Sequence, residues 1–305
     1  MKLGFLTACL PGLELEQIAE WAAAADFDAL EVAAWRRVGG RSFTASHVDA
    51  ANLPEADVER IRGLFDRLRL ELSSLAYYDN LHPDPVERKA VNDHVLACVD
   101  AAARLGCPTV GTFVGRDPGR TVAENLREAE QVFPPLVERA GERGVKLMVE
   151  NCPMEGWHPD GYPANLAYSP ELWEWMFSLG LYLNYDPSHL VWLGIDPVTA
   201  VRPYLDRIPH AQAKDTEVFA DRRNHYGVFG KAVARTDPWD VGWWRYRVPG
   251  LGQVDWRRLV DAMYEGGFEG AFSVEHEDPV WGGDEARIKL GLQIAQRTLR
   301  PLMVT

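Results

Sequence analysis

The 305-residue chain has no long apolar run: none approaches the ~18 consecutive apolar residues that a membrane-spanning helix needs. Its first residues, Met1 to Thr7, lead into Pro11-Gly12 without the cleavage pattern of a secretory signal peptide. We therefore expect a cytoplasmic protein that does not bind membranes.

Cysteine is scarce and scattered. The four residues Cys9, Cys98, Cys107 and Cys152 include no Cys-x-x-Cys pair, so neither a zinc knuckle nor a disulfide framework is expected. Buried free thiols are the simplest interpretation. Cys152 follows Glu150 by two residues and is a candidate for lining a pocket, but the sequence shows no partner base that would make it a nucleophile.

Positive charge is also in short supply, with 32 Lys and Arg against 45 Asp and Glu and a net charge of -13. Nucleic acid is not an expected partner, because phosphate backbones are bound by basic surface. No Gly-x-Gly-x-x-Gly follows the first apolar run, which argues against a doubly wound sheet that binds dinucleotides. A Gly-rich phosphate cradle is also missing after the last two predicted strands, and the sequence leaves open whether the substrate is phosphorylated.

Short apolar runs alternate with amphipathic stretches along the whole chain, as expected of repeated βα units. The predicted strands are Leu3–Ala8, Ala29–Ala33, Glu71–Ala76, Thr109–Val114, Val145–Glu150, Leu181–Asp186, Pro209–Lys214 and Ala271–Glu275. The predicted helices are Leu15–Ala25, Glu55–Leu68, Val86–Leu105, Ala123–Arg143, Pro170–Leu179, Pro197–Tyr204, Trp256–Tyr264 and Glu285–Arg297. This pattern predicts an α/β protein: a single (β/α)8 TIM barrel domain over residues 1–305, with its chemistry at the C-terminal ends of the strands.

Two features depart from the regular pattern. Pro134-Pro135 should kink or split the fourth helix. The connection between Asp215 and Trp256, which joins strands 7 and 8, is long and rich in aromatic residues, as expected of a lid or an interface. Its aromatic side chains suit either stacking on a sugar-like ring or burial against another subunit.

Four carboxylates mark the ends of predicted strands: Glu150, Asp186, Asp215 and Glu275. Nitrogen and amide ligand types lie close to two of them, namely His189 after Asp186, and His210 with Gln212 before Asp215. Carboxylates gathered with imidazole or amide groups suit a divalent cation. The alternative for a single strand-end carboxylate is a helix cap or an ion pair, and Asp215, next to Lys214, is interpreted in that way.

Glu150 and Glu275 belong to the fifth and eighth strands, three apart around an eight-stranded ring. A cation held between them would polarise a carbonyl group and stabilise an enediolate, while a positioned carboxylate removes the α-proton. On the seventh strand, residues two apart share one face, so His210 should lie one layer below Gln212, and Lys214 should share that face. His158 falls in the loop after the Glu150 strand, where it is placed to touch a substrate.

Several motifs together resemble the sugar phosphate isomerase/epimerase group with the xylose-isomerase-like barrel. They are Val149-Glu150-Asn151, Tyr185-Asp186-Pro187-Ser188-His189, His210-x-Gln212-x-Lys214-Asp215, Pro249-Gly250-Leu251-Gly252-x-x-Asp255-Trp256 and Ser273-Val274-Glu275-His276-Glu277-Asp278, with Tyr77-Tyr78 after the third strand. The resemblance implies one divalent ion, commonly manganese, magnesium or cobalt, held by Glu150, Asp186, Gln212 and Glu275. The family often has His where this chain has Gln212, and the amide oxygen favours Mn²⁺ or Mg²⁺ over Zn²⁺, unless His210 takes that place.

The resemblance further implies that Glu150 and Glu275 act as base and acid and that His189 contacts a substrate oxygen. The expected activity is a metal-dependent isomerase or epimerase acting on a sugar, keto-sugar or polyol derivative. A similar barrel occurs in enzymes that cleave 3-oxo-glycosides, including C-glycosides, by β-elimination with a small β-rich partner subunit, so a lyase is the alternative. A homo-oligomer or such a hetero-oligomer is expected. The candidate substrate-binding residues are His158, His210, Lys214, Tyr77, Trp244 and Arg247.

The sequence supports two other functions less well than these. A related barrel endonuclease would have three metals, more histidine ligands and a basic groove, and the net charge of -13 disfavours it. A non-catalytic metal-binding protein is the second.

Overall fold

The protein is described from a computed structural model, which covers residues 1–36, 45–79, 85–154, 163–233, 235–236 and 240–304. His158, predicted to contact substrate, lies outside the described residues. Within the described ranges, no helix is both long enough and apolar enough to pass through a membrane.

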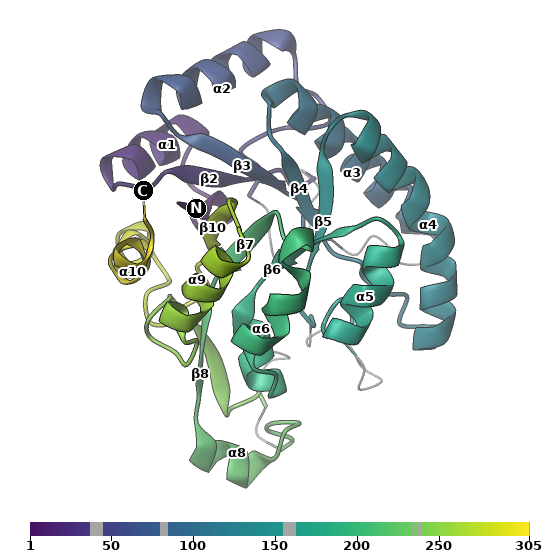
Figure 1. Cartoon of the computed structure of the whole chain (residues 1–305), viewed down its shortest axis with the longest axis vertical. Coiled ribbons are helices and arrows are strands. Elements are labelled where there is room, and N and C mark those ends of the chain that lie inside the picture. The colour runs from purple at the N-terminus through teal and green to yellow at the C-terminus, as the bar shows by residue number, and fades with distance from the viewer. Residues whose placement is uncertain (37–44, 80–84, 155–162, 234, 237–239, 305) are drawn as a thin grey trace.

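Eight parallel strands close into a barrel in the order β1-β10-β7-β6-β5-β4-β3-β2 (Figure 1). They are β1 (Lys2–Leu6), β2 (Ala29–Ala33), β3 (Glu71–Ala76), β4 (Thr109–Thr112), β5 (Lys146–Glu150), β6 (Tyr182–Tyr185), β7 (His210–Ala213) and β10 (Ala271–Val274). The first and last of these strands close the ring, with Lys2 opposite Ala271 and Phe5 opposite Val274. The predicted (β/α)8 barrel is confirmed.

The helices surround the barrel on its outside (Figure 1). They are α1 (Leu15–Ala24), α2 (Glu55–Leu68), α3 (Pro85–Leu105), α4 (Val122–Glu142), α5 (Pro170–Ser178), α6 (Pro187–Leu193), α7 (Pro197–Val201), α8 (Ala220–Tyr226), α9 (Trp256–Glu265) and α10 (Glu285–Leu299), with 3₁₀ turns at Thr7–Cys9, Arg202–Arg207 and Arg300–Leu302. Each predicted helix is present. The predicted helix Pro197–Tyr204 corresponds to α7 and becomes 3₁₀ after Val201, since Pro203 has no N–H to continue the α-helical bonds.

Several strands end one or two residues before the predicted end. Asp186 is an example, because it follows β6 and acts as the N-cap of α6, where its Oδ1 accepts a 2.8 Å hydrogen bond from the amide of Ser188. The short helix α6 was not predicted. The residue that ends a strand therefore also begins the next turn, which places its carboxylate above the barrel.

The fourth helix was predicted to be kinked or split at Pro134-Pro135, and the split is wrong, since α4 runs without interruption through both prolines. Both prolines are exposed, whereas Phe133 and Leu136 are buried against the barrel. The carbonyl groups that lose their helical partner can therefore bond to water.

The long connection between β7 and β10 contains regular structure. Strand β8 (Asp215–Val218) pairs in antiparallel fashion with β9 (Trp244–Arg247), with Asp215 opposite Arg247 and Val218 opposite Trp244. Together with α8, this two-stranded sheet projects from the barrel (Figure 1). We refer to residues 215–247 as the insertion.

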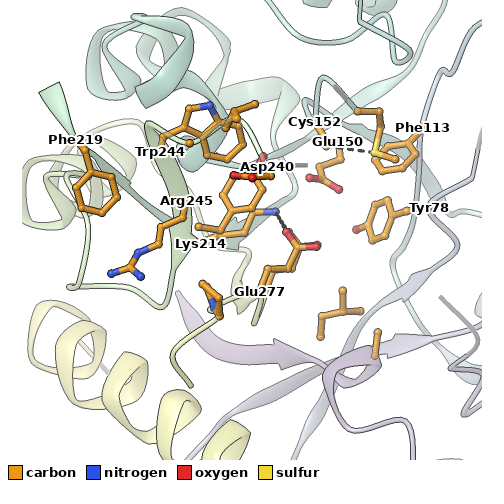
Figure 2. Close-up of a pocket in the computed structure, with 18 of the residues that line it drawn as sticks. Tyr78, Phe113, Glu150, Cys152, Lys214, Phe219, Asp240, Trp244, Arg245 and Glu277 are labelled. Carbon is orange, nitrogen blue, oxygen red and sulfur yellow. Dashed lines mark hydrogen bonds and ion pairs between the residues drawn. The ribbon is translucent and has the colours of Figure 1, made fainter. Parts of the chain in front are cut away.

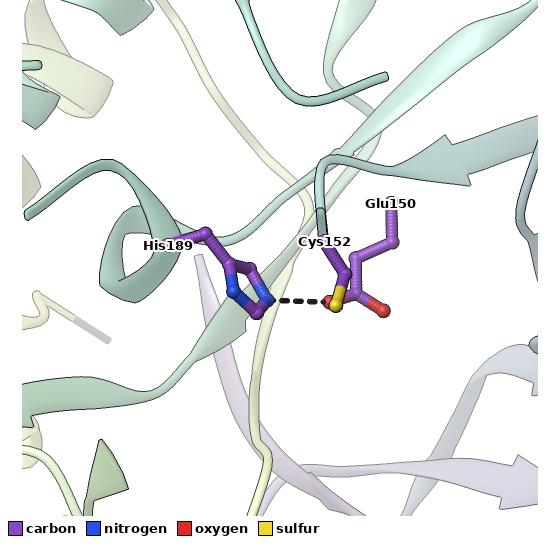
Figure 3. Close-up of side chains that lie close together, drawn as sticks. All are labelled: Glu150, Cys152 and His189. Atoms are coloured by element: carbon purple, nitrogen blue, oxygen red, sulfur yellow. Dashed lines mark hydrogen bonds and ion pairs between the residues drawn. The ribbon is translucent and has the colours of Figure 1, made fainter. Parts of the chain in front are cut away.

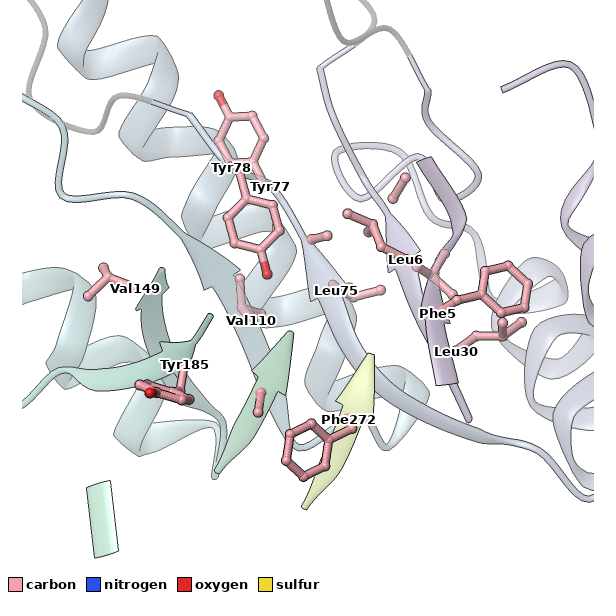
Figure 4. Close-up of a cluster of buried hydrophobic side chains, with 14 of the residues drawn as sticks. Phe5, Leu6, Leu30, Leu75, Tyr77, Tyr78, Val110, Val149, Tyr185 and Phe272 are labelled. Atoms are coloured by element: carbon pink, nitrogen blue, oxygen red, sulfur yellow. The ribbon is translucent and has the colours of Figure 1, made fainter. Parts of the chain in front are cut away.

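Successive side chains of each strand point alternately to the outside and the inside of the barrel, so the core has an outer and an inner part. The outward side chains, Phe5 and Phe272 among them (Figure 4), are apolar and contact the helices. Phe5 packs edge-on against Trp21 of α1, and Phe272 packs against Trp256 of α9. The interior is polar. His210 lies between Ser73 and Asn184, at 3.2 and 2.9 Å, and Asn184 donates to the hydroxyl of Tyr78, which donates to Glu31. These bonds link polar side chains from opposite sides of the barrel.

Two glycines allow a matched test of packing. A Cβ at Gly4 in β1 would lie 2.4 Å from the carbonyl oxygen of Ala29 in the next strand, whereas a Cβ at Gly63 in α2 meets nothing within 4 Å. We expect Gly4→Ala to lower the free energy of unfolding by about 1–3 kcal/mol through overpacking. Gly63→Ala should raise it by about 0.5–1 kcal/mol. Urea unfolding of both variants checks this, and equal effects would contradict the close approach at Gly4.

Candidate active site

A cavity of about 690 Å³ opens at the C-terminal ends of the barrel strands. Carboxylates line its floor, and aromatic and charged side chains contribute to its wall (Figure 2). The insertion contributes one side of the wall. The lining residues used below are Trp35, Tyr78, Phe113, Glu150, Cys152, Met154, Lys214, Phe219, Trp244, Arg245, Tyr246, Glu275 and Glu277.

Three of the predicted ligand carboxylates meet at the floor of the cavity. One oxygen each of Glu150, Asp186 and Glu275 lies within 4.8 Å of the other two. Glu150 ends β5, while Asp186 and Glu275 directly follow β6 and β10. Parallel strands place their C-terminal ends on the same rim, so carboxylates distant in sequence become neighbours.

Gln212 lies between two of these carboxylates. One terminal atom of its buried carboxamide is 3.2 Å from both carboxylate oxygens of Glu150 and 3.2 Å from Oε2 of Glu275. With nitrogen at this position, the amide donates to the carboxylates. With oxygen there and both glutamates ionised, only acceptors face one another, and a cation between them would offset the repulsion. The all-oxygen set of Glu150, Asp186, Gln212 and Glu275 therefore fits a hard divalent ion.

Lys214 supplies a buried positive charge to the same cluster. Its Nζ lies 3.2 Å from Oδ2 of Asp186, 2.5 Å from Oε2 of Glu275 and 3.0 Å from Oε2 of Glu277. The ammonium also lies 4.5 Å from the centre of the Tyr246 ring, a cation–π distance. Although burial opposes it, the surrounding carboxylates raise the pKa of Lys214 well above its usual range, so the side chain stays charged.

The pKa values of the three carboxyl groups shift in different directions in this environment. Burial raises the pKa of Glu150 well above its usual range, and the charge of Glu275 adds to the rise. Burial also raises the pKa of Glu275, to about 8, against the influence of Lys214. Asp186 is the exception: burial acts in the opposite direction, but Lys214 and His189 lower its pKa to about 2. Asp186 is thus held in its charged form beside Lys214, whereas their surroundings favour the protonated forms of Glu150 and Glu275 more than water would.

His189 on α6 is fully buried beside the carboxylates. Its Nε2 lies 3.0 Å from Oε1 of Glu150 and 3.2 Å from Oδ2 of Asp186, and its Nδ1 lies 2.8 Å from the hydroxyl of Tyr246. Burial lowers its pKa, although Asp186 acts against this. A neutral imidazole flanked by two acceptors carries its proton on Nε2, so Tyr246 donates to Nδ1.

The predicted substrate-binding residues are not all at the cavity. Lys214 and Trp244 line it, and Trp244 stacks on Trp192 with a centroid distance of 4.7 Å. His210 lies lower in the barrel, in the hydrogen-bond chain described above, and does not line the cavity. This place also makes His210 an unsuitable replacement for Gln212 as a metal ligand.

Tyr77 and Arg247 also point elsewhere. The hydroxyl of Tyr77 donates to Asp79, and its ring packs on His94. Arg247 pairs with Asp278 and Glu217 at 2.8 and 2.7 Å. Neighbouring residues line the cavity in their place: Tyr78 beside Tyr77, and Arg245 two residues before Arg247.

Sequence reasoning did not single out Tyr78, Tyr246 or Glu277 as site residues. Tyr246 contacts both His189 and Lys214, and Glu277 contacts Lys214. The acidic run Glu275 to Asp278 was the one available signal for Glu277, because residues two apart tend to share a side of the chain.

Comparison with known proteins places the chain in a family. Residues 19–298 match the family model described as Xylose isomerase-like TIM barrel, and the chain belongs to this family. The protein YfiH of Bacillus subtilis (strain 168) is 27% identical over 332 residues, covering 98% of this chain and 99% of that protein. Inosose dehydratase of Clostridium tetani (strain Massachusetts / E88) is 34% identical over 102 residues, which are 32% of each chain.

Solved structures share the same fold. D-allulose 3-epimerase from Methylomonas sp. superposes with a TM-score of 0.66 at 16% identity, covering 99% of this chain and 98% of that one. The IolI protein, solved with a bound zinc atom, superposes with a TM-score of 0.68 at 19% identity, covering 99% of this chain and 96% of that one.

Asp215 anchors the segment that follows the insertion. Its Oδ1 accepts bonds from the amides of Thr216 and Val254 at 2.8 and 2.9 Å, and its Oδ2 accepts from Gly250 and the indole of Trp256 at 3.0 and 2.9 Å. A Cβ at Gly252 would lie 2.2 Å from Oδ1, which explains the glycine there. The interpretation of Asp215 as a structural residue fits these contacts, although its partners are loop amides and not Lys214.

We expect Asp215→Asn to destabilise the protein. The new NH₂ group would face N–H donors, which leaves two buried donors unsatisfied at about 1–3 kcal/mol each. Urea unfolding should show a loss of at least about 2 kcal/mol. Asp261→Asn, at an exposed position of α9, is the control and should change stability by less than about 0.5 kcal/mol. Similar small losses in both variants would contradict the anchoring role.

Proposed function

We propose that this protein is a divalent-metal-dependent isomerase or epimerase that acts on a sugar, keto-sugar or polyol derivative. The observation that carries the proposal is the approach of Glu150 and Glu275 to the same terminal atom of the Gln212 amide at the floor of a large cavity. Two carboxyl groups with raised pKa values, held this close to a substrate pocket, suit the removal and return of a proton. The related D-allulose 3-epimerase has the same fold.

Glu150, Asp186, Gln212 and Glu275 are the proposed metal ligands, with Mn²⁺ as the expected ion and Mg²⁺ or Co²⁺ as alternatives. When bound, the ion would polarise a carbonyl oxygen of the substrate and stabilise negative charge on it. The two glutamates take the proton from the carbon next to the carbonyl and return it. The ammonium of Lys214 and the imidazole of His189 lie beside them and bind substrate oxygens.

The aromatic wall fits a carbohydrate substrate. Trp35, Tyr78, Phe113 and Trp244 face the cavity, and such rings stack on the apolar faces of sugars. The stacked pair Trp192–Trp244 fixes one of these rings. The ring of Tyr246 is held by His189 and Lys214, so this part of the wall is rigid before substrate arrives.

Elimination is the second candidate. It begins with the same proton removal and then expels a group from the next carbon. Local similarity to inosose dehydratase favours it, as does the cavity volume of about 690 Å³, which accommodates a sugar with a further group attached. A 3-oxo-glycoside is the substrate proposed for this reaction, with a small β-rich partner subunit. The product mass separates the two candidates, since an epimer keeps the mass of the substrate and elimination does not.

Metal binding should be measurable as a gain in stability. Chelator-treated protein should unfold at a higher temperature when Mn²⁺ is added, with about 2.7 kcal/mol of stabilisation at a concentration 100-fold above the dissociation constant. Gln212→Leu removes the neutral oxygen ligand and should weaken Mn²⁺ binding. Should Mn²⁺, Mg²⁺ and Co²⁺ all leave the unfolding temperature unchanged, the metal-dependent proposal is wrong.

Proton exchange tests the role of the glutamates. Metal-loaded protein incubated with ketoses in deuterium oxide should introduce deuterium next to the carbonyl group. Glu275→Gln should slow this exchange by about 10²–10⁴-fold, because a general acid–base group is lost. Glu269→Gln, an exposed glutamate at the opposite end of the same strand, is the matched control. Exchange that continues at the wild-type rate in Glu275→Gln would refute the assignment.

A further inference from the structure

A second set of ligand atoms lies beside the carboxylate cluster. The Sγ of Cys152, a ring nitrogen of His189 and a carboxylate oxygen of Glu150 all lie within 4.8 Å of one another (Figure 3). All three side chains are buried, and Cys152 and Glu150 line the cavity. The set shares Glu150 with the oxygen ligands but replaces the other oxygens with sulfur and nitrogen.

The chemistry of this set differs from that of the oxygen cluster. A thiolate, an imidazole and one carboxylate suit a borderline ion such as Zn²⁺ or Co²⁺, whereas carboxylate and amide oxygens suit Mn²⁺ or Mg²⁺. Two bonds of about 2.0–2.3 Å span at most about 4.5 Å, so the three side chains reach a common ion with small movements. Three protein ligands leave a fourth position that opens to the cavity.

We propose that Cys152, His189 and Glu150 form a site for a borderline divalent ion, distinct from the oxygen site of Glu150, Asp186, Gln212 and Glu275. On binding, the thiol proton of Cys152 is released to solvent and the sulfur bonds to the ion as a thiolate. The proposal does not depend on the enzymatic activity, because it concerns ion binding alone.

The backbone around this site is held in place by two asparagines. The Nδ2 of Asn165 donates to the carbonyl groups of Glu150 and Cys152 at 2.9 and 2.7 Å. The amide of Asn151 bonds to both backbone groups of Asp186, at 2.8 and 2.7 Å, and so joins the ends of β5 and β6. These bonds fix Glu150 and Cys152 relative to the start of α6, which carries His189. A ligand set held this way loses little entropy on binding.

The surroundings of Cys152 are themselves suited to a soft donor. Its Sγ lies 3.4 Å from the thioether sulfur of Met154, and both side chains line the cavity. Met154 has a φ of 52°, a left-handed conformation that non-glycine residues seldom adopt. The thioether sulfur of Met154 is a weak acceptor for the Cys152 thiol.

Tyr246 allows His189 to serve as a ligand. Without an ion, Nε2 carries the proton and faces two carboxylates. With an ion on Nε2, the proton moves to Nδ1, and the hydroxyl of Tyr246, 2.8 Å away, accepts it instead of donating. Rotation of one hydroxyl hydrogen is the only rearrangement that this change of tautomer requires of the neighbouring side chain.

Co²⁺ added to chelator-treated protein tests the site directly, since a cobalt–thiolate bond gives a near-ultraviolet charge-transfer band. Wild type should show the band, and Cys152→Ser should lose it and bind Zn²⁺ at least about 10-fold more weakly, the lower limit for losing even an outer ligand contact. Cys107→Ser, which alters a buried thiol bonded to the carbonyl of Thr109, is the matched control and should keep the band.

Gln212→Leu provides the opposite comparison. It should weaken Mn²⁺ binding and keep the cobalt–thiolate band, whereas Cys152→Ser should keep Mn²⁺ binding and lose the band. A second measurement needs no variant, because bound Zn²⁺ should protect Cys152 from alkylation, as read by peptide mass. Absence of the band in wild type, its retention in Cys152→Ser, or alkylation of Cys152 at an unchanged rate with Zn²⁺ bound would overturn the proposal.

Discussion

The arrangement of the cavity floor depends on neutralising carboxylates that are buried together. Glu150, Asp186 and Glu275 lie within 4.8 Å of one another with little contact with water. Buried charges are costly unless they are paired, and the ammonium of Lys214 pairs with two of these three groups. The other contacts of Lys214 follow from this requirement. Its stem passes the ring of Tyr246, which in turn bonds to His189, so the insertion is tied to the same charge cluster.

Hydrogen bonds hold this cluster from below and from above. Below it, the chain Ser73–His210–Asn184–Tyr78–Glu31 crosses the barrel and leaves few ways for the inner side chains to rearrange. Above it, the carboxylate of Asp215 accepts hydrogen bonds from backbone amides of the loop that follows the insertion. A hydrophobic barrel interior would pack equally well, but it would not fix the direction of Tyr78, the one residue of the crossing chain that also lines the cavity.

The sequence predicted the barrel and the carboxylates that meet at its rim because both depend on local patterns. Alternating βα units define the ring, and a carboxylate at the end of a strand reaches its rim whatever the loops do. Which individual side chains face the cavity depends on strand register and on partners that are distant in the sequence. Of Tyr77 and Tyr78, which follow a strand with an irregular register against β2, sequence alone does not indicate which one faces the cavity. Arg247 was assigned to the cavity, but Asp278 and Glu217, 31 and 30 residues away in the chain, hold it elsewhere. The pairing of β8 with β9 that brings these groups together has no short-range signal.

Formal charge shows why a divalent ion would suit the floor of the cavity. Glu150, Asp186 and Glu275 carry three negative charges when ionised and Glu277 carries a fourth, against the one positive charge of Lys214. Either two protons or one divalent ion would offset two of the remaining charges. Burial raises the pKa values of both Glu150 and Glu275, which favours protons on these two groups over Asp186, whose pKa is lowered. A neutral ligand at position 212 preserves this balance, whereas a glutamate there would add a charge with no partner. The proton-bearing glutamates and the ion are thus alternatives for the same two charges, and the amide of Gln212, with nitrogen or oxygen turned inward, is able to accompany either one.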